Sequence, residues 1–209
     1  MIAVITGDVI NSRNITADWI DTLKSSLSTL FGEKTKWEIF RGDSFQLEIS
    51  APEALLQAIY IKACLKTIKK ADVRMGIGIG EKNIDSEKIT EANGEAFILS
   101  GAAFDALKAT KTNLAIQSRW DGFDEDFNLS IRLALIAMDS WGQISAEMVK
   151  YAIENQDIKQ DKIAKITGRS QSSVSEALKR AHFNEIMDLE HKYRTQINKL
   201  IRQHGNRTA

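Results

Sequence analysis

Two Gly-Asp pairs are the residues of this chain whose types and positions most directly suggest chemistry. Gly7-Asp8 ends the β-rich run MIAVITG, and Gly42-Asp43 lies between the short alternating runs KWEIF and SFQLEIS, whose pattern predicts a β-hairpin. Carboxylate oxygens are ligands that suit Mg²⁺ and Mn²⁺. Asp8 and Asp43 are therefore candidate metal ligands, with simple turn formation as the alternative for each Gly-Asp pair.

The elements that must position these carboxylates alternate along the first 118 residues. Hydrophobic periodicity predicts the order β-α-β-β-α-β, followed by a further α-β pair. That order is typical of a mainly antiparallel sheet with helices on one face, in which the first two strands are parallel and the third lies between them. The end of the first strand and the hairpin tip then meet at one edge of the sheet. Asp8 and Asp43 would repel each other there unless a cation lies between them.

Basic side chains near these turns would suit a triphosphate bound with the metal. Arg13 follows the first strand, Arg41 precedes the hairpin glycine and Arg74 opens the strand VRMGIGIG. For each arginine the alternative is an ordinary solvated surface position. The three alternating glycines of that strand favour a closely packed helix over a dinucleotide site, because no helix opens directly after them. The predicted nucleotide contacts are Gly42, Arg13, Arg41 and Arg74.

The strongest local pattern is the stretch QDKIAKITGRSQSSVSEALKR in the C-terminal third of the chain. A small residue at Ala164 lets two helices cross closely, and Gly168 supplies the positive φ of a turn. Val174 and Leu178 would fill the angle between the helices, and Ser170 is positioned to cap the second one. The spacing predicts a helix-turn-helix.

In a helix-turn-helix, the second helix lies in the major groove of DNA with its first turns facing the base edges. Basic side chains around it bind phosphates, and this part of the affinity falls with salt. A helical hairpin used for packing or for protein contacts is the alternative. The predicted DNA contacts are Gln171, Ser172, Ser175 and Glu176 at the bases, Lys165, Arg169, Lys179 and Arg180 at the phosphates, and Ser170 at the start of the helix.

Charge divides the chain in a similar way. The 209 residues have no net charge, yet residues 1–144 hold 16 Lys and Arg against 20 Asp and Glu, and residues 145–209 hold 12 against 8. Formal charges of −4 and +4 are compatible with a basic DNA-binding module on an acidic body. A chance distribution of surface charge is the alternative.

The polar run RWDGFDED predicts a domain boundary after the last strand. We expect a first domain over 1–124, a connecting helix over 125–144 and a helix-turn-helix domain over 145–209 that ends in a long helix. In that last helix, apolar residues repeat at three- and four-residue steps, as in a coiled coil. This stripe could pack back on the helix-turn-helix or pair with a second copy in a homodimer.

The chain lacks the sequence features of secreted and membrane proteins. No basic leader precedes the apolar N-terminal run, and no apolar stretch reaches the roughly 18–20 residues that cross a bilayer. The single cysteine, Cys64, has no partner for an internal disulfide. We expect a cytoplasmic protein with no membrane partner.

The two turns also carry a resemblance to known enzymes. ITGDVINS followed by FRGDSF resembles the palm of class III nucleotidyl cyclases and of GGDEF diguanylate cyclases, in which aspartates at these two places bind two metal ions. The resemblance implies Asp8 and Asp43 as metal ligands and a backbone carbonyl from Val9 or Ile10. It also implies activation of a 3′-hydroxyl for attack on an α-phosphate.

Departures from these enzymes weigh against turnover. Class III cyclases carry an Asn and an Arg on the following helix, where they stabilise charge on the phosphates, whereas this chain has Ser100 and Phe104 at those places. Ser44 stands where diguanylate cyclases have a glutamate. Loss of one such donor typically costs about 2.7–4 kcal/mol of transition-state stabilisation. A binding site is therefore expected to persist where catalysis does not.

Over nearly its full length, the chain resembles the SatD family of bacterial proteins, through MIAVITGDVINSR, FRGDSFQ and SQSSVSEALKRA. The expected fold is α+β: a ferredoxin-like palm domain (βαββαβ plus αβ) followed by an all-α helix-turn-helix domain. The expected function is a DNA-binding transcriptional regulator whose cyclase-like domain binds a nucleotide with Mg²⁺. The alternatives are an active nucleotidyl cyclase or nucleotidyltransferase with an accessory helix-turn-helix, and a non-enzymatic interaction scaffold.

Overall fold

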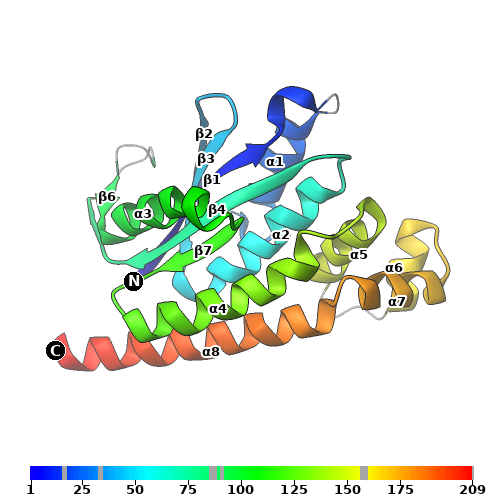
Figure 1. Cartoon of the computed structure of the whole chain (residues 1–209). Coiled ribbons are helices and arrows are strands. Elements are labelled where there is room, and N and C mark those ends of the chain that lie inside the picture. Colours follow the sequence, from blue (N-terminus) through cyan, green and yellow to red (C-terminus); the bar gives the residue numbers. More distant parts are fainter. Residues whose placement is uncertain (16–17, 33–34, 85–88, 90–91, 156–159, 209) are drawn as a thin grey trace.

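The computed structural model describes residues 1–15, 18–32, 35–84, 89, 92–155 and 160–208. An N-terminal five-stranded mixed sheet with helices is followed by an all-helical C-terminal region (Figure 1). The α+β class and the change to helices in the C-terminal part both agree with the sequence prediction. The path of the chain explains how the candidate site residues reach their positions.

Five strands build the main sheet. They are β1 (Ile2–Ile10), β2 (Lys36–Phe40), β3 (Ser44–Ser50), β4 (Asp72–Gly80) and β7 (Leu114–Gln117), and a separate two-stranded ribbon consists of β5 (Lys82–Ile84) and β6 (Asn93–Gly94). The order in the main sheet is β2-β3-β1-β4-β7. β3 pairs antiparallel with both β1 and β2, so β1 and β2 are parallel, as predicted. β4 pairs antiparallel with β1, and β7 is a parallel neighbour of β4.

The helices divide between the two regions of the chain. Those of the sheet region are α1 (Trp19–Ser28), α2 (Ala54–Lys66) and α3 (Glu95–Thr110), with short 3₁₀ turns η1 (Ser12–Asn14) and η3 (Ala51–Glu53). Those of the helical region are α4 (Asp121–Met138), α5 (Gln143–Glu154), α6 (Gln160–Thr167), α7 (Gln171–Arg180) and α8 (Phe183–Thr208).

Helices cover both faces of the sheet: α1 and α2 share one face, as the βαββαβ order predicts, whereas α3 of the appended α-β pair covers the other face. Every second residue of β4 from 76 to 80 is a glycine, and the backbone of α3 packs on this glycine face; a Cβ added at Gly78 would lie 2.1 Å from the backbone nitrogen of Ser100. Successive strand residues face opposite ways. The other face of β4 carries Met75, Ile77 and Ile79, which join the core formed with α1 and α2. The glycine face is what lets α3 lie opposite those helices.

Most of the polar run at which a domain boundary was expected forms the start of a helix. α4 begins at Asp121, so the expected 124/125 boundary lies inside α4, and α5 begins two residues before position 145. Asp121 and Asp124 occupy the first turn of α4, where carboxylates interact favourably with the helix dipole. Asp124 also accepts hydrogen bonds from the backbone N–H and the hydroxyl of Ser118, at 2.7 and 2.6 Å. Acidic residues that suggest a turn are here the start of a helix.

α8 lies along α4 and uses its apolar stripe within the chain (Figure 1). Tyr193 and Ile197 on this stripe are buried. The Tyr193 hydroxyl donates a hydrogen bond to the carbonyl oxygen of Ala51 at 2.7 Å, and its ring centroid lies 5.9 Å from that of Phe123. Of the two alternatives for the stripe, the structure therefore favours closure onto the same chain.

A buried ion cluster joins the sheet region to the helical region. The Lys62 side chain on α2 is 1% exposed, and its ammonium nitrogen lies 2.6 Å from a carboxylate oxygen of Asp72 and 2.6 Å from one of Asp139. Asp72 opens β4, and Asp139 directly follows α4. Lys66 donates to the second oxygen of Asp72 at 3.3 Å and to the backbone carbonyl of Asp139 at 2.6 Å. The end of α4 is thus fixed to the start of β4.

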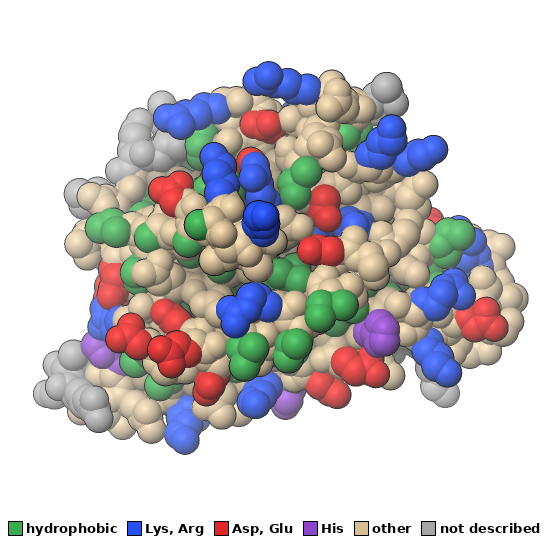
Figure 2. All heavy atoms as spheres, in the orientation of Figure 1, with side chains coloured by type: hydrophobic (Ala, Val, Ile, Leu, Met, Phe, Trp, Pro, Cys, Tyr) green, Lys and Arg blue, Asp and Glu red, His purple; other side chains and the backbone are tan. Residues whose placement is uncertain are grey.

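One helix keeps large apolar side chains at the surface. Leu129, Leu133 and Ile136 on α4 are 51%, 62% and 75% exposed, and Figure 2 shows a row of hydrophobic side chains on this part of the molecule. Within the described part of the chain, no helix combines the length and the apolar character that crossing a bilayer requires.

Replacing Gly78 by alanine should destabilise the fold, because the added methyl group would overlap the backbone of α3. We expect the free energy of unfolding, measured by urea denaturation, to fall by about 3 kcal/mol, the upper end of typical overpacking costs. Gly101→Ala is the matched control: an added Cβ at this α3 position meets no atom within 4 Å. This control should stabilise the helix by about 0.5–1 kcal/mol. Equal stability of the two variants would contradict the close packing.

Candidate functional site

Asp8 and Asp43 lie in one cleft at the edge of the sheet. Asp8 stands near the end of β1, paired in register with Ser44 of β3 and with Arg74 of β4. Asp43 directly precedes β3, and its carbonyl oxygen accepts a hydrogen bond from the backbone N–H of Val9 at 3.1 Å. Both aspartates line a cleft of about 500 Å³. The structure brings the two residues together, as the element order predicts.

The cation beside these carboxylates is a side chain of the protein, Arg74. Its Nε donates to one carboxylate oxygen of Asp8 at 2.9 Å, and its Nη2 donates to the other. The hydrogen bonds and charge of Asp8, helped by the charge of Asp43, raise the pKa of the Arg74 guanidinium, while burial opposes this. Asp43 accepts a hydrogen bond from the Ser12 hydroxyl at 2.7 Å. Arg74 therefore offsets the repulsion for which the sequence analysis invoked a metal.

The other predicted nucleotide contacts surround this pair unevenly. Arg13 lines the cleft together with Arg74, whereas Arg41 and Gly42 lie in the adjoining hairpin turn, outside the lining. Arg41 and Gly42 have φ angles of +52° and +89°. Glycine adopts such angles without strain, and a Cβ at position 42 would meet no atom within 4 Å. The role of Gly42 in the structure is therefore to form the turn.

Four polar residues of the cleft were missed by sequence reasoning: Asn11, Ser12, Asn14 and Asn113. The carbonyl oxygen of Asn113 accepts a hydrogen bond from the backbone N–H of Met75 at 2.9 Å, which fixes Asn113 next to Arg74 along β4. The predicted final strand, β7, was the signal in the sequence that could have indicated Asn113. When this strand pairs parallel to β4 with Leu114 opposite Met75, the residue before β7 lies beside Arg74.

The donor set of the cleft fits Mg²⁺ only together with phosphate oxygens. Among the described residues, no three His, Cys, Asp or Glu side chains are grouped so that they could hold a metal ion. Mg²⁺ is, however, commonly bound by one or two carboxylates, with substrate phosphates and water supplying the remaining ligands. Asp8 and Asp43 could supply these carboxylates if Arg74 exchanged its bonds to Asp8 for bonds to a phosphate.

α3 contributes nothing to this cleft among the residues described. Ser100, at the place where cyclases carry a phosphate-directed side chain, is fully buried. Its hydroxyl lies 2.9 Å from that of Thr6 and donates to the carbonyl oxygen of Phe97 at 2.9 Å. Ser100 therefore closes the contact between α3 and β1, and it is not available to a ligand.

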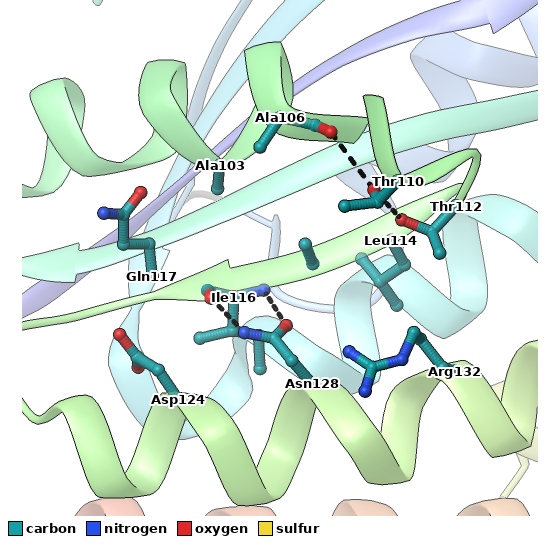
Figure 3. A pocket seen from close by; sticks show the side chains of 11 residues that line it. Ala103, Ala106, Thr110, Thr112, Leu114, Ile116, Gln117, Asp124, Asn128 and Arg132 are labelled. Carbon is teal, nitrogen blue, oxygen red and sulfur yellow. Dashed lines mark hydrogen bonds between the residues drawn. The ribbon is translucent and has the colours of Figure 1, made fainter. Parts of the chain in front are cut away.

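A second pocket, of about 300 Å³, lies between α3, β7 and α4 (Figure 3). The side-chain oxygen of Asn128 accepts a hydrogen bond from the backbone N–H of Ile116, and its amide nitrogen donates to the carbonyl oxygen of Ile116, both at 2.8 Å. Asp124, another lining residue, is bonded to Ser118. These polar groups serve the edge of the sheet, which makes the carboxylate cleft the better candidate for a ligand.

In the helical region, α6 and α7 are joined at the turn that their sequence predicts. Gly168 lies between them with a φ of +64°. The Ser170 hydroxyl caps α7 by accepting a hydrogen bond from the backbone N–H of Ser173 at 3.2 Å. The apolar residues expected at the helix contact are all buried: Ala164, Val174 and Leu178.

The predicted DNA contacts differ in their accessibility. Arg169 donates to a carboxylate oxygen of Glu147 at 3.0 Å, so its guanidinium joins the turn to α5. Ser175 is half-buried, and Glu176 lies 3.8 Å from Arg180 in an exposed ion pair. The exposed members of the set are Lys165, Ser170, Gln171, Ser172, Glu176, Lys179 and Arg180.

Comparison with known proteins adds no family to these observations. No family model matches the chain, and no curated protein matches its sequence. The carboxylate cleft and the α6–α7 pair are therefore the features of the molecule that point to a function.

Arg74→Ala should lower the free energy of unfolding by about 1.5–3 kcal/mol at neutral pH, because it leaves the Asp8 carboxylate without its charged donor. Adding Asp8→Asn removes the stranded charge, so a double-mutant cycle in urea should give a coupling of at least about 1 kcal/mol. Arg13→Ala, which truncates an exposed arginine of the same cleft, is the control and should change stability by less than about 0.5 kcal/mol. Strictly additive effects of the Asp8 and Arg74 substitutions would contradict the pairing.

Proposed function

We propose that the chain is a DNA-binding transcriptional regulator. Its proposed architecture, a ferredoxin-like, cyclase-like domain followed by a helix-turn-helix domain, is the one that the resemblance to the SatD family implies. The observation that carries the proposal is the exposed, capped first turn of α7. Gln171 and Ser172 in this turn are exposed, and Ser170 caps it. In helix-turn-helix proteins, the corresponding turn faces the base edges in the major groove.

The side chains of this turn suit DNA readout. Glutamine can form two hydrogen bonds with adenine, and serine can bond to several bases. Lys165, Lys179 and Arg180 are exposed near this turn or at the far end of α7 and would bind phosphates. Arg169 is left out of the contact set, because its guanidinium bonds Glu147.

We further propose that the cleft binds a nucleotide with Mg²⁺. The supporting chemistry is two carboxylates, the cations of Arg13 and Arg74, and the amide side chain of Asn113 in one lining. Asp8 and Asp43 would hold the ion, which would neutralise charge on the phosphates. Binding is assigned here without turnover, because none of the described α3 residues directs a donor into the cleft.

A continuous set of contacts connects this cleft to the helical region. Arg74 at the cleft and Asp72 at the ion cluster are two residues apart on β4. Lys62 joins Asp72 to Asp139 at the end of α4. Trp141 lies two residues after Asp139. Its indole N–H donates a hydrogen bond to the carbonyl oxygen of Ala181, which directly follows α7, at 2.9 Å. A ligand that draws Arg74 away from Asp8 would act on β4, and this route would carry the effect to α7.

Selection of genomic fragments by the purified protein, followed by fluorescence anisotropy, tests DNA binding. We expect Gln171→Ala to reduce discrimination for the selected sequence by about 1–3 kcal/mol, and Lys165→Ala to weaken all sequences and lower the salt slope by about one. Lys24→Ala, which removes an exposed lysine of α1, is the control and should change neither quantity. Weak binding with no enriched sequence would contradict the proposal.

Titration calorimetry with Mg²⁺ and a panel of nucleoside triphosphates tests the cleft. We expect at least one nucleotide to bind, and Asp43→Ala and Arg74→Ala to weaken it by at least about tenfold, or 1.4 kcal/mol. Chelation of Mg²⁺ should weaken it as well. Asp105→Asn alters an exposed carboxylate of α3 outside the cleft and should bind as the unmodified protein does. The absence of heat for every nucleotide would remove this half of the proposal.

A further inference from the structure

The exposed apolar stripe on α4 has no partner within the chain. Its members, Leu129, Leu133 and Ile136, are spaced by four and three residues, which aligns them on one side of the helix. The other large exposed hydrophobic residues of the described chain lie singly on different elements: Ile20, Ile98, Ile144 and Ile166. Contiguous apolar surface of this kind marks an interaction site, whereas scattered single residues do not.

The stripe borders a groove of about 670 Å³ between the C-terminal half of α4 and the start of α8. Leu133 and Ile136 line this groove from α4, Leu189 lines it from α8, and His182 and Glu185 are also part of its lining. An apolar ridge next to an apolar groove suits ridge-into-groove packing with a surface of the same kind. The face is therefore shaped to pack against a copy of itself.

Charge along the α4 side of this face changes sign from one end to the other. Three exposed carboxylates precede the stripe, and the exposed end of α7, with the adjoining His182 in the groove lining, lies beyond it. The acidic residues are Asp121, Glu125 and Asp126, and the residues at the other end are Lys179, Arg180 and His182. The remaining charged residues of this stretch serve other contacts: Asp124 and Arg132 line the pocket beside β7, and Asp139 pairs with Lys62.

Charge along the α8 side runs in the reverse direction. Glu185 lines the groove beside Ile136, near the end of α4, whereas Lys192 lines a pocket beside Asp126, near its beginning. Asp188 adds to the acidic end of α8, and Lys199 and Arg202 add to its basic end; all three are exposed. The two sides of the face thus carry opposite charge gradients.

We propose that this face is the interface of a homodimer, with the two-fold axis crossing α4 near Leu133. Such an axis sets α4 antiparallel to α4 of the second copy and α8 antiparallel to α8, so each end of the face meets the opposite end of its copy. The carboxylates of α4 then face Lys179 and Arg180, and Glu185 faces the basic half of α8. Both gradients are complementary in this arrangement, and a parallel arrangement would oppose like charges.

This interface differs from the one considered from the sequence, because the α8 stripe is occupied by contacts within the chain. It does not depend on DNA binding. If both proposals hold, the two α7 helices lie on opposite sides of the two-fold axis, each beyond the C-terminal end of its own α4.

Sedimentation equilibrium of the full chain, without DNA, tests the interface. We expect the unmodified protein to have twice the chain mass, and Leu133→Glu to raise the dimer dissociation constant by at least about tenfold, as for a central interface residue. Ile98→Glu alters an equally exposed isoleucine on α3 and should remain dimeric. Circular dichroism and urea unfolding of both variants check that each is folded.

A charge exchange and a cross-link make the test specific for the antiparallel arrangement. Glu125→Lys with Asp126→Lys should weaken the dimer, and adding Lys179→Glu with Arg180→Glu should restore it. Leu133→Cys, close to the two-fold axis, should form a disulfide between copies on oxidation, whereas Ile98→Cys should not. The native Cys64 does not interfere, because it is buried and burial raises the pKa of its thiol to about 12. A monomer at the highest soluble concentration, or a dimer unaffected by Leu133→Glu, would overturn the proposal.

Discussion

The ammonium group of Lys62 fixes how the two regions of this chain meet. A buried charge is stable only when it is paired, and Lys62 has two carboxylates, Asp72 from the sheet and Asp139 from the end of α4. Removal of one partner from a buried ion pair typically costs about 3–5 kcal/mol, and the pair with Asp72, whose side chain is 16% exposed, comes closer to this case than the pair with Asp139, which is 40% exposed. α8 adds a second link, because the Tyr193 hydroxyl donates a hydrogen bond to the carbonyl oxygen of Ala51 in η3. Both contacts join the sheet region to the helical region.

The carboxylates of the cleft are also paired with a cation of the protein. The pairing of β1 with β3 brings Asp8 and Asp43 together. Without a cation nearby, the repulsion between their two carboxylates would be unfavourable. β4 supplies Arg74 at the matching register position, so the fold carries its own counter-ion. A ligand with phosphates and a divalent ion could take over both roles, since the ion would satisfy the carboxylates and the phosphates would satisfy the guanidinium. The cleft is then stable without a ligand, and a ligand has to replace the hydrogen bonds between Arg74 and Asp8.

Much of this arrangement could be predicted from the sequence, because hydrophobic periodicity and turn residues show where strands and helices follow one another along the chain. This succession predicts the neighbours of β1 in the sheet and the shared edge of Asp8 and Asp43. The α6–α7 turn is predicted by the spacing of its apolar residues and its glycine. The position of α3 did not follow, because strand glycines do not indicate which face a helix covers. The pairings of Arg74 and Arg169 did not follow either, since partners distant in sequence are defined only once strands and helices are in register. The start of α4 was obscured because acidic residues favour both turns and first helical turns.

Asn128 has a consequence for how this protein avoids unwanted assembly. Its side-chain amide occupies both backbone hydrogen-bonding groups of Ile116 on the outer strand β7. Exposed edge strands are common starting points of aggregation, because their free backbone groups can pair with a strand of another molecule. At Ile116 such pairing is blocked, since both backbone groups are already hydrogen-bonded to Asn128. Growth by added strands is thereby discouraged at this border.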